Sequence, residues 1–134
     1  MRQKITMAIF MSILLLCFIG CSQVGKIEIQ KATSSYSDFW IEKDKVYIKY
    51  ELTIKNTGSA KQKVKMTADF DEDKKAGLLK ESHLVGYEEN LHSNEFTIKS
   101  GTNNDVAVVF IGEFAGNNQK QDRVLPKINI ERVN

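Results

Sequence analysis

Residues 46–55, VYIKYELTIK, carry the clearest hydrophobic pattern of the chain. Apolar and polar side chains alternate over the whole stretch, which predicts a β-strand with one buried face. The face predicted to be buried consists of Val46, Ile48, Tyr50, Leu52 and Ile54. The segment NTGS at 56–59 then has the composition of a turn.

The same alternation returns at residues 64–70, VKMTADF, and predicts a second strand. Its buried face is expected to consist of Val64, Met66, Ala68 and Phe70. Because this strand follows the first one across a turn, we expect the two to pair as a hairpin.

Four further segments are typical of strands. Residues 26–32, 95–99 and 124–133 have apolar side chains at alternate positions, and Pro126 marks the entry to the last of them. Residues 105–111, DVAVVFI, are apolar at nearly every position, which favours a central strand buried on both faces.

Two segments have less regular patterns. Residues 76–92 fit either a short helix or two short strands, and Gly86 argues against a long helix. Ser34, Ser35 and Ser37 are expected in a polar loop that leads to Trp40. With one proline and closely spaced turn signals, the chain is predicted to form an all-β sandwich.

Residues 1–20 have the layout of a signal peptide. Arg2 and Lys4 give it a positive start, and residues 5–19 are free of charge. A helix over residues 5–20 would be about 24 Å long, whereas a membrane span needs roughly 20 residues. The alternatives are an ordinary secretory signal with a soluble product and an uncleaved membrane helix.

The sequence Phe18-Ile19-Gly20-Cys21 resembles the lipoprotein box of bacterial lipoproteins. The resemblance implies that the signal peptidase recognises Phe18, Ile19 and Gly20 and cleaves before Cys21. It also implies that the Cys21 sulfur carries a diacylglycerol with palmitate-like chains, which anchors the protein on the extracytoplasmic face of the cell membrane. Residues 21–26 would then be the lipidated N-terminus and a short linker, and residues 27–134 the folded domain.

Cleavage before Cys21 would change the cysteine content and the charge balance of the mature protein. Cys17 leaves with the signal and Cys21 carries lipid, so the domain has neither a disulfide nor a free thiol. Arg2 and Lys4 are two of the 19 basic residues, which leaves 17 basic against 17 acidic residues. This neutral balance argues against nucleic acid as a partner.

Two blocks of sequence are similar to the immunoglobulin-like domains of bacterial surface lipoproteins, of the telokin-like, immunoprotective-antigen type. They are YIKYELTIKNTG at 47–58, a strand with an Asn-x-Gly turn, and FTIKSGTNNDVAVVF at 96–110, two strands joined at a glycine turn. The resemblance implies an immunoglobulin-like antiparallel β-sandwich. It implies no reaction, because most members of that family have no known activity.

Asp69, Asp71 and Asp73 have the D-x-D-x-D spacing that opens a calcium loop. Lys74 and Lys80 stand where that loop needs glycine and glutamate, and on a continued strand the carboxylates would be about 6.6 Å apart. We therefore expect a solvated strand edge and no metal site, with calcium as the alternative.

The remaining polar residues suggest no catalysis. His83 and His92 are nine residues apart and match no local zinc spacing. The serines before Trp40 lack the glycine elbow of a nucleophile, and no phosphate loop is present. We expect no catalytic residue and no cofactor.

Tyr36, Phe39 and Trp40 form an aromatic cluster in the sequence. A sandwich core needs a large aromatic side chain, so Trp40 is expected in the core. The alternative is that the three residues form a surface for a protein partner.

These features predict a monomeric, non-enzymatic lipoprotein that contacts a membrane or membrane-proximal protein of the cell envelope. One alternative is an exclusion or immunity lipoprotein of a mobile element, which blocks conjugation, phage or a peptide toxin. A second is an accessory lipoprotein that binds a solute or metal. Loops at 34–40 or 112–122 are the expected places of contact.

Overall fold

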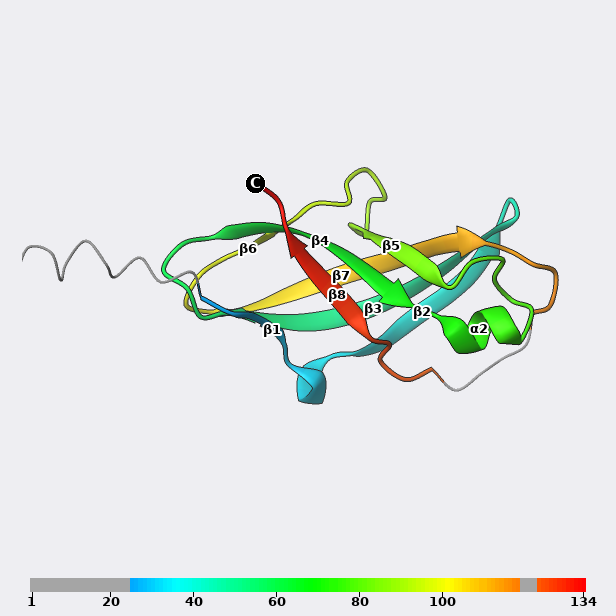
Figure 1. Cartoon of the computed structure of the whole chain (residues 1–134), viewed down its shortest axis with the longest axis horizontal. Helices are drawn as coiled ribbons and strands as arrows, with labels where there is room; N and C mark the ends of the chain where they lie inside the picture. The colour runs from blue at the N-terminus through cyan, green and yellow to red at the C-terminus, as the bar shows by residue number, and fades with distance from the viewer. Residues whose placement is uncertain (1–24, 119–122) are drawn as a thin grey trace, which may run out of the picture.

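The protein is described here by a computed structural model that covers residues 25–118 and 123–134. Nearly all of its regular structure is β, and every strand pairing is antiparallel, which confirms the all-β antiparallel fold (Figure 1). The elements in chain order are β1 (Ile27–Ile29), a 3-10 turn (Lys31–Thr33), β2 (Ser35–Glu42), β3 (Lys45–Asn56), β4 (Gln62–Asp69), α2 (Asp71–Lys75), β5 (His83–Tyr87), β6 (Phe96–Ile98), β7 (Asn103–Glu113) and β8 (Ile128–Arg132).

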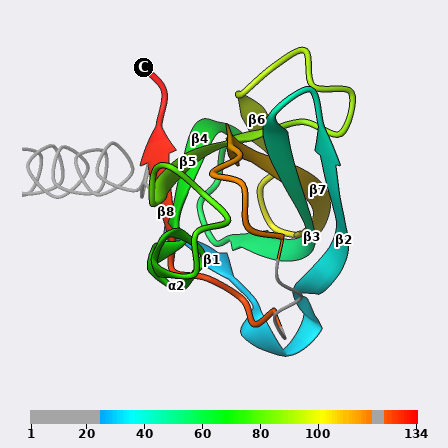
Figure 2. The same cartoon turned by 90° about the vertical axis from the view of Figure 1, so that its right-hand side faces the viewer.

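The strands form one sheet that rolls into two layers (Figure 2). In one layer β3 pairs with β7 along one edge, and β1 and β2 share its other edge. In the other layer β4 pairs with β6 and β8, and β5 joins the layers by pairing with both β4 and β7. β1 and β8 are not paired with each other in the described chain, so the sheet is a nearly closed sandwich with one open seam.

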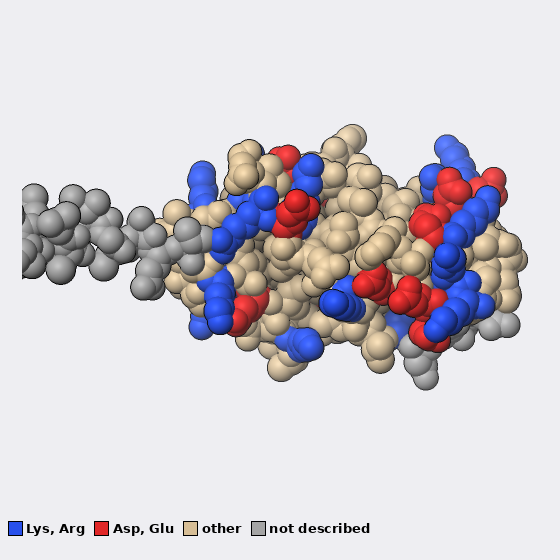
Figure 3. Space-filling view, viewed as in Figure 1, with Lys and Arg blue, Asp and Glu red and all other residues tan. Residues whose placement is uncertain are grey.

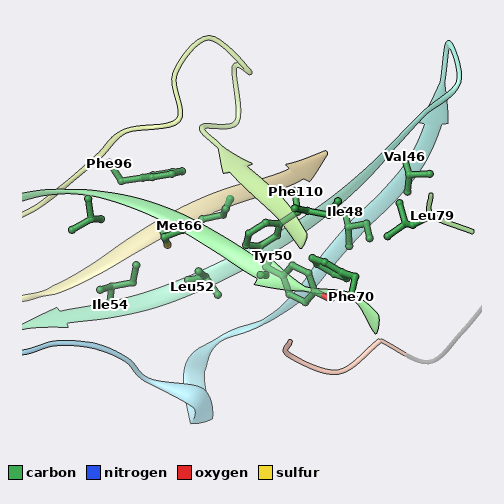
Figure 4. Packing of buried hydrophobic residues seen from close by; sticks show 14 of the residues in the cluster. Val46, Ile48, Tyr50, Leu52, Ile54, Met66, Phe70, Leu79, Phe96 and Phe110 are labelled. Atoms are coloured by element: carbon green, nitrogen blue, oxygen red, sulfur yellow. The ribbon is translucent and has the colours of Figure 1, made fainter. Parts of the chain in front are cut away.

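The core lies between the two layers, and its main row comes from β3. All five apolar positions predicted for residues 46–55 are at most 1% exposed. They pack against Val64, Met66 and Ala68 of β4, which confirms the predicted buried faces of both strands (Figure 4). An aromatic group of Tyr50, Phe70 and Phe110 fills one part of this core, with ring centroids 5.5–6.4 Å apart.

The layers approach closely where β5 passes between β4 and β7. Gly86 faces inward there, and a Cβ atom on it would lie 2.6 Å from a methyl carbon of Val108 and 3.3 Å from the Met66 carbonyl oxygen. A side chain at this position would force Val108 to move. The close packing of β5 against its neighbours explains why a glycine occupies position 86. Gly86 lies in a strand, in agreement with the argument from sequence against a long helix.

The expected hairpin of β3 and β4 is wrong. β3 forms its hairpin with β2 across Lys43 and Asp44, which both have positive φ (49° and 62°), as a two-residue hairpin turn requires. Residues 57–61 instead carry the chain from the β3 layer to the β4 layer. Alternation identifies which face of a strand is buried. It does not identify the neighbouring strand, because β3 buries the same face whichever strand pairs with it.

The polar loop expected at Ser34, Ser35 and Ser37 is also wrong beyond Ser34, because β2 begins at Ser35. A β-bulge between Tyr36 and Asp38 shifts the register there and breaks the alternation that would have predicted a strand. Ser34 is nearly buried, and its hydroxyl accepts a 2.9 Å hydrogen bond from the Thr53 amide, where β1 ends and β2 has not yet begun.

The other expected strands are present. They correspond to β1, β6, β7 and β8, and β7 is buried on both faces at residues 108–110. The ambiguous range 76–92 contains a single strand, β5, and the short helix α2 precedes it. Neither of the two alternatives for 76–92 was therefore correct.

Candidate functional site

β2 divides the predicted aromatic cluster between two faces of the sheet. Phe39 lies opposite Ile48 and packs on the core, whereas Trp40 lies opposite Tyr47 on the outer face. The bulge brings Tyr36 opposite Tyr50 on the inner side, with ring centroids 6.0 Å apart. The core position expected for Trp40 is thus wrong, and the three residues do not form one surface.

Trp40 is instead the first member of a row that crosses four strands, called here the apolar row and composed of Trp40, Tyr47, Ile111 and Val85. Each member lies opposite the next one in register, from β2 through β3 and β7 to β5. The Trp40 and Tyr47 rings are stacked, with centroids 5.0 Å apart and planes 2° apart. Val85 is 38% exposed and the other three members are half-buried.

Charged pairs border the apolar row on both sides. On one side the Lys49 ammonium contacts Glu89 and lies 3.4 Å from the Glu51 carboxylate. The Lys49 ammonium donates a hydrogen bond to the Glu89 carboxylate, and this bond raises the pKa of Lys49. On the other side the Lys45 ammonium lies 4.0 Å from the Glu113 carboxylate.

A buried ion pair lies elsewhere, at the end of the sandwich that holds α2. A guanidinium nitrogen of Arg123 is 3.1 Å and 3.2 Å from the two carboxylate oxygens of Asp73, and both side chains are at least nine-tenths buried. The guanidinium also lies 4.8 Å from the centre of the Phe39 ring. This pair joins α2 to the segment before β8 and explains why Asp73 tolerates burial.

Tyr50 belongs to the same region. Its hydroxyl donates a 3.2 Å hydrogen bond to the Val124 carbonyl, and burial raises the pKa of Tyr50 to about 12. The hydrogen bond holds the segment before β8 against the core.

The solvated edge predicted for the three aspartates is wrong. The strand ends at Asp69, which bonds the His83 ring at 2.7 Å. Asp71 points to solvent in the first turn of α2, and Asp73 is buried against Arg123. Within residues 25–118 and 123–134, no three His, Cys, Asp or Glu side chains are arranged to hold a metal ion.

An open groove of about 790 Å³ follows the seam between β1 and β8. Its floor is formed by half-buried apolar side chains that belong to the edge of the core, namely Ile27, Ile29, Leu125, Ile128 and Ile130. Arg132 bridges one end of the seam by donating a hydrogen bond to the Gly25 carbonyl. The groove is wide and shallow, unlike the enclosed pockets that hold small molecules.

The predicted lipid site, Cys21, and the peptidase residues Phe18, Ile19 and Gly20 lie outside the described residues and stay predictions. Neither helical segment in the described part of the chain has the length and hydropathy to cross a membrane.

Comparison with known proteins identifies no relative. No family model, no curated protein and no solved structure matches the chain.

The sequence contained one signal for the apolar row that our prediction did not use. Tyr47 is an aromatic residue on the otherwise polar face of a strictly alternating strand. Ile111 and Val85 carried no comparable signal, because only the register of β7 and β5 brings them to the same face.

Proposed function

We propose that this protein is a non-enzymatic interaction module, held by a lipid on Cys21 at the extracytoplasmic face of the cell membrane. Its partner is a membrane protein or a membrane-proximal part of one. The observation that carries this proposal is the apolar row on the outer face of the sheet.

The apolar row is unusual because of where it lies. The outer face of an antiparallel sheet normally carries polar side chains, since only one face covers the core. Contiguous exposed apolar side chains on such a face are typical of protein interaction sites. Trp and Tyr are favoured in these sites because they offer large contact areas with few rotatable bonds, and a polar rim usually surrounds such a contact.

The length of the chain limits where the partner lies. The linker from Ser22 to Lys26 spans at most about 18 Å when fully extended. Tyr47 is nine residues along β3 from Asn56, which lies beside the start of the domain, so the apolar row is about 30 Å from that end. A partner anchored in the same membrane is within reach, and the shared plane raises its effective concentration.

In-cell crosslinking tests the contact. The full chain would be expressed with a photo-crosslinking residue at Tyr47, and at Lys65 on β4 as a control outside the apolar row. We expect a membrane protein to be captured from Tyr47 only, and the capture to disappear with Trp40→Ser and Val85→Ser. Capture of a soluble or wall-bound protein, or equal capture from Lys65, would contradict the proposal.

The anchor is tested separately. Cys21→Ala should abolish incorporation of labelled palmitate and leave the precursor uncleaved or released from the membrane. Equal labelling of the variant and the natural chain would rule out Cys21 as the lipid site.

A further inference from the structure

Several segments meet at the end of the sandwich where the described chain begins, at the left in Figure 1. The Lys26 amide donates a 2.8 Å hydrogen bond to the Thr57 hydroxyl, and Arg132 bonds the Gly25 carbonyl. The Gly101 amide donates to the Asn56 carbonyl at 3.0 Å. The start of β1, the connections at 57–61 and 99–102 and the end of β8 therefore form one surface.

This surface is rich in positive charge. Its exposed basic side chains, called here the basic end, are Lys26, Lys55, Lys61, Lys99 and Arg132. Segments 55–61 and 99–104 contain no acidic residue. Within the described chain, none of the five side chains forms an ion pair with a carboxylate. The nearest acidic residues along the chain are Glu28, Glu51, Asp69, Glu95 and Glu131.

The opposite end of the molecule is different. Lys80 and Lys45 both lie within 4.0 Å of Glu113, and Lys75 lies 3.3 Å from Glu72. Figure 3 shows the same contrast: basic side chains predominate toward the left-hand end, whereas basic and acidic side chains are interleaved at the right-hand end. The positive charge is thus a local property, because residues 21–134 have equal numbers of basic and acidic residues.

We propose that the basic end docks on a bilayer surface that contains anionic phospholipid. Four to eight basic residues next to a membrane anchor suffice for such binding, with roughly a fivefold gain in affinity from each. The two connections between the lysines, NTGSA and SGT, are built of small and uncharged residues. Along these two connections, headgroup phosphates can therefore approach the ammonium groups of Lys61 and Lys99 without meeting a bulky or acidic side chain.

The inference rests on the proposed function in one respect, which is that the Cys21 anchor brings this end to the membrane. Docking would then fix the orientation of the domain, with the strands rising from the bilayer. The apolar row would then lie about 30 Å above the bilayer surface. With a flexible linker alone, the orientation of the apolar row would be undefined.

The test measures lysine acetylation on reconstituted protein. The full chain, purified from membranes in mild detergent, would be reconstituted into vesicles of phosphatidylcholine alone or with 30% phosphatidylglycerol. Acetylation of Lys61 and Lys99 should be at least fivefold slower on the anionic vesicles. Lys43 and Lys74, at the opposite end, should react equally on both, and 0.5 M salt should remove the difference because it screens exposed charges.

Matched variants separate this inference from the anchor. Lys61→Glu with Lys99→Glu should abolish the protection of Lys26 and Lys55, whereas Lys43→Glu with Lys74→Glu should leave it intact. Equal acetylation on both vesicles, with the protein retained on both, would overturn the inference and leave the anchor standing. Loss of protein from neutral vesicles would disprove the anchor; retention on anionic vesicles would then still support the basic end, and loss from both would overturn it.

Discussion

Each end of this sandwich is held together by a buried polar side-chain contact, but the two contacts differ in chemistry. At the basic end the fully buried Asn56 side chain donates to the carbonyls of Ala60 and Ile98, at 3.0 and 3.2 Å, and accepts from the Gly58 amide at 2.9 Å. At the other end, α2 and the segment before β8 are held together by the buried ion pair of Asp73 and Arg123.

The two contacts differ in the cost of removing their polar groups from water. A neutral amide is desolvated at low cost when all its hydrogen bonds are made, and Asn56 makes them mostly with residues nearby in sequence. A buried ion pair carries a large desolvation penalty that only an intact pair offsets. It joins residues 50 positions apart, whereas the bonds of the Asn56 side chain to Ala60 and Gly58 are local.

The largest effect should come from breaking the ion pair. Arg123→Met leaves the Asp73 carboxylate buried without a cation, and we expect a loss of about 3–5 kcal/mol in the free energy of unfolding. Urea denaturation measures it. Asp73→Leu combined with Arg123→Met should recover most of the stability, because no unpaired charge remains; a double variant as unstable as the single one would contradict this account.

The amide at the opposite end should come next. Asn56→Ala leaves the Gly58 amide and the Ile98 carbonyl without partners in a buried place, at a cost of about 2–3 kcal/mol. Asn104 is the matched control, because its side chain also donates to backbone carbonyls and accepts from a backbone amide, but nearer to solvent. Asn104→Ala should cost about 1 kcal/mol, since water replaces its contacts. Equal losses for both variants would show that burial does not distinguish them.

Alkaline pH should weaken the end that holds α2. The pKa of Tyr50 is raised from 10.0 to about 12, so the folded state keeps a proton that the unfolded state loses. Stability from this group is complete below pH 10 and falls as pH rises toward 12, by roughly 2 kcal/mol at pH 12. Thermal unfolding between pH 9 and 12 should show a shallower decline in Tyr50→Phe than in the natural chain.

The smallest effect should come from the lysines of the basic end. Lys61→Glu with Lys99→Glu changes exposed, unpaired residues, so the free energy of unfolding should change by less than about 0.5 kcal/mol. The same variant should lose its preference for anionic vesicles. A stability loss comparable with that of Asn56→Ala would mean that these lysines support the fold instead of a membrane contact.

The sequence alone determined which face of each main strand is buried. Alternation at Val46, Ile48 and Tyr50 is a local property of a strand with one dry side, and the structure confirms it. The apolar run of β7 likewise predicted a central strand. These predictions succeeded because burial on one face needs no knowledge of the neighbour.

Only the tertiary structure decided what lies beside what. β3 and β4 bury similar rows yet occupy different layers, because the turn at Lys43 and Asp44 pairs β3 with β2 instead. The bulge in β2 then determines that Phe39 faces the core and Trp40 the solvent.

The candidate sites depend on the same long-range register. The apolar row combines residues up to 71 positions apart, and Asp73 is buried only because Arg123 returns to it across 50. Contacts between residues this far apart in the sequence cannot be predicted from the local hydrophobic pattern. Hydrophobic periodicity records whether a side chain meets water, whereas pairing, layers and ion pairs depend on contacts between segments that are remote in the sequence.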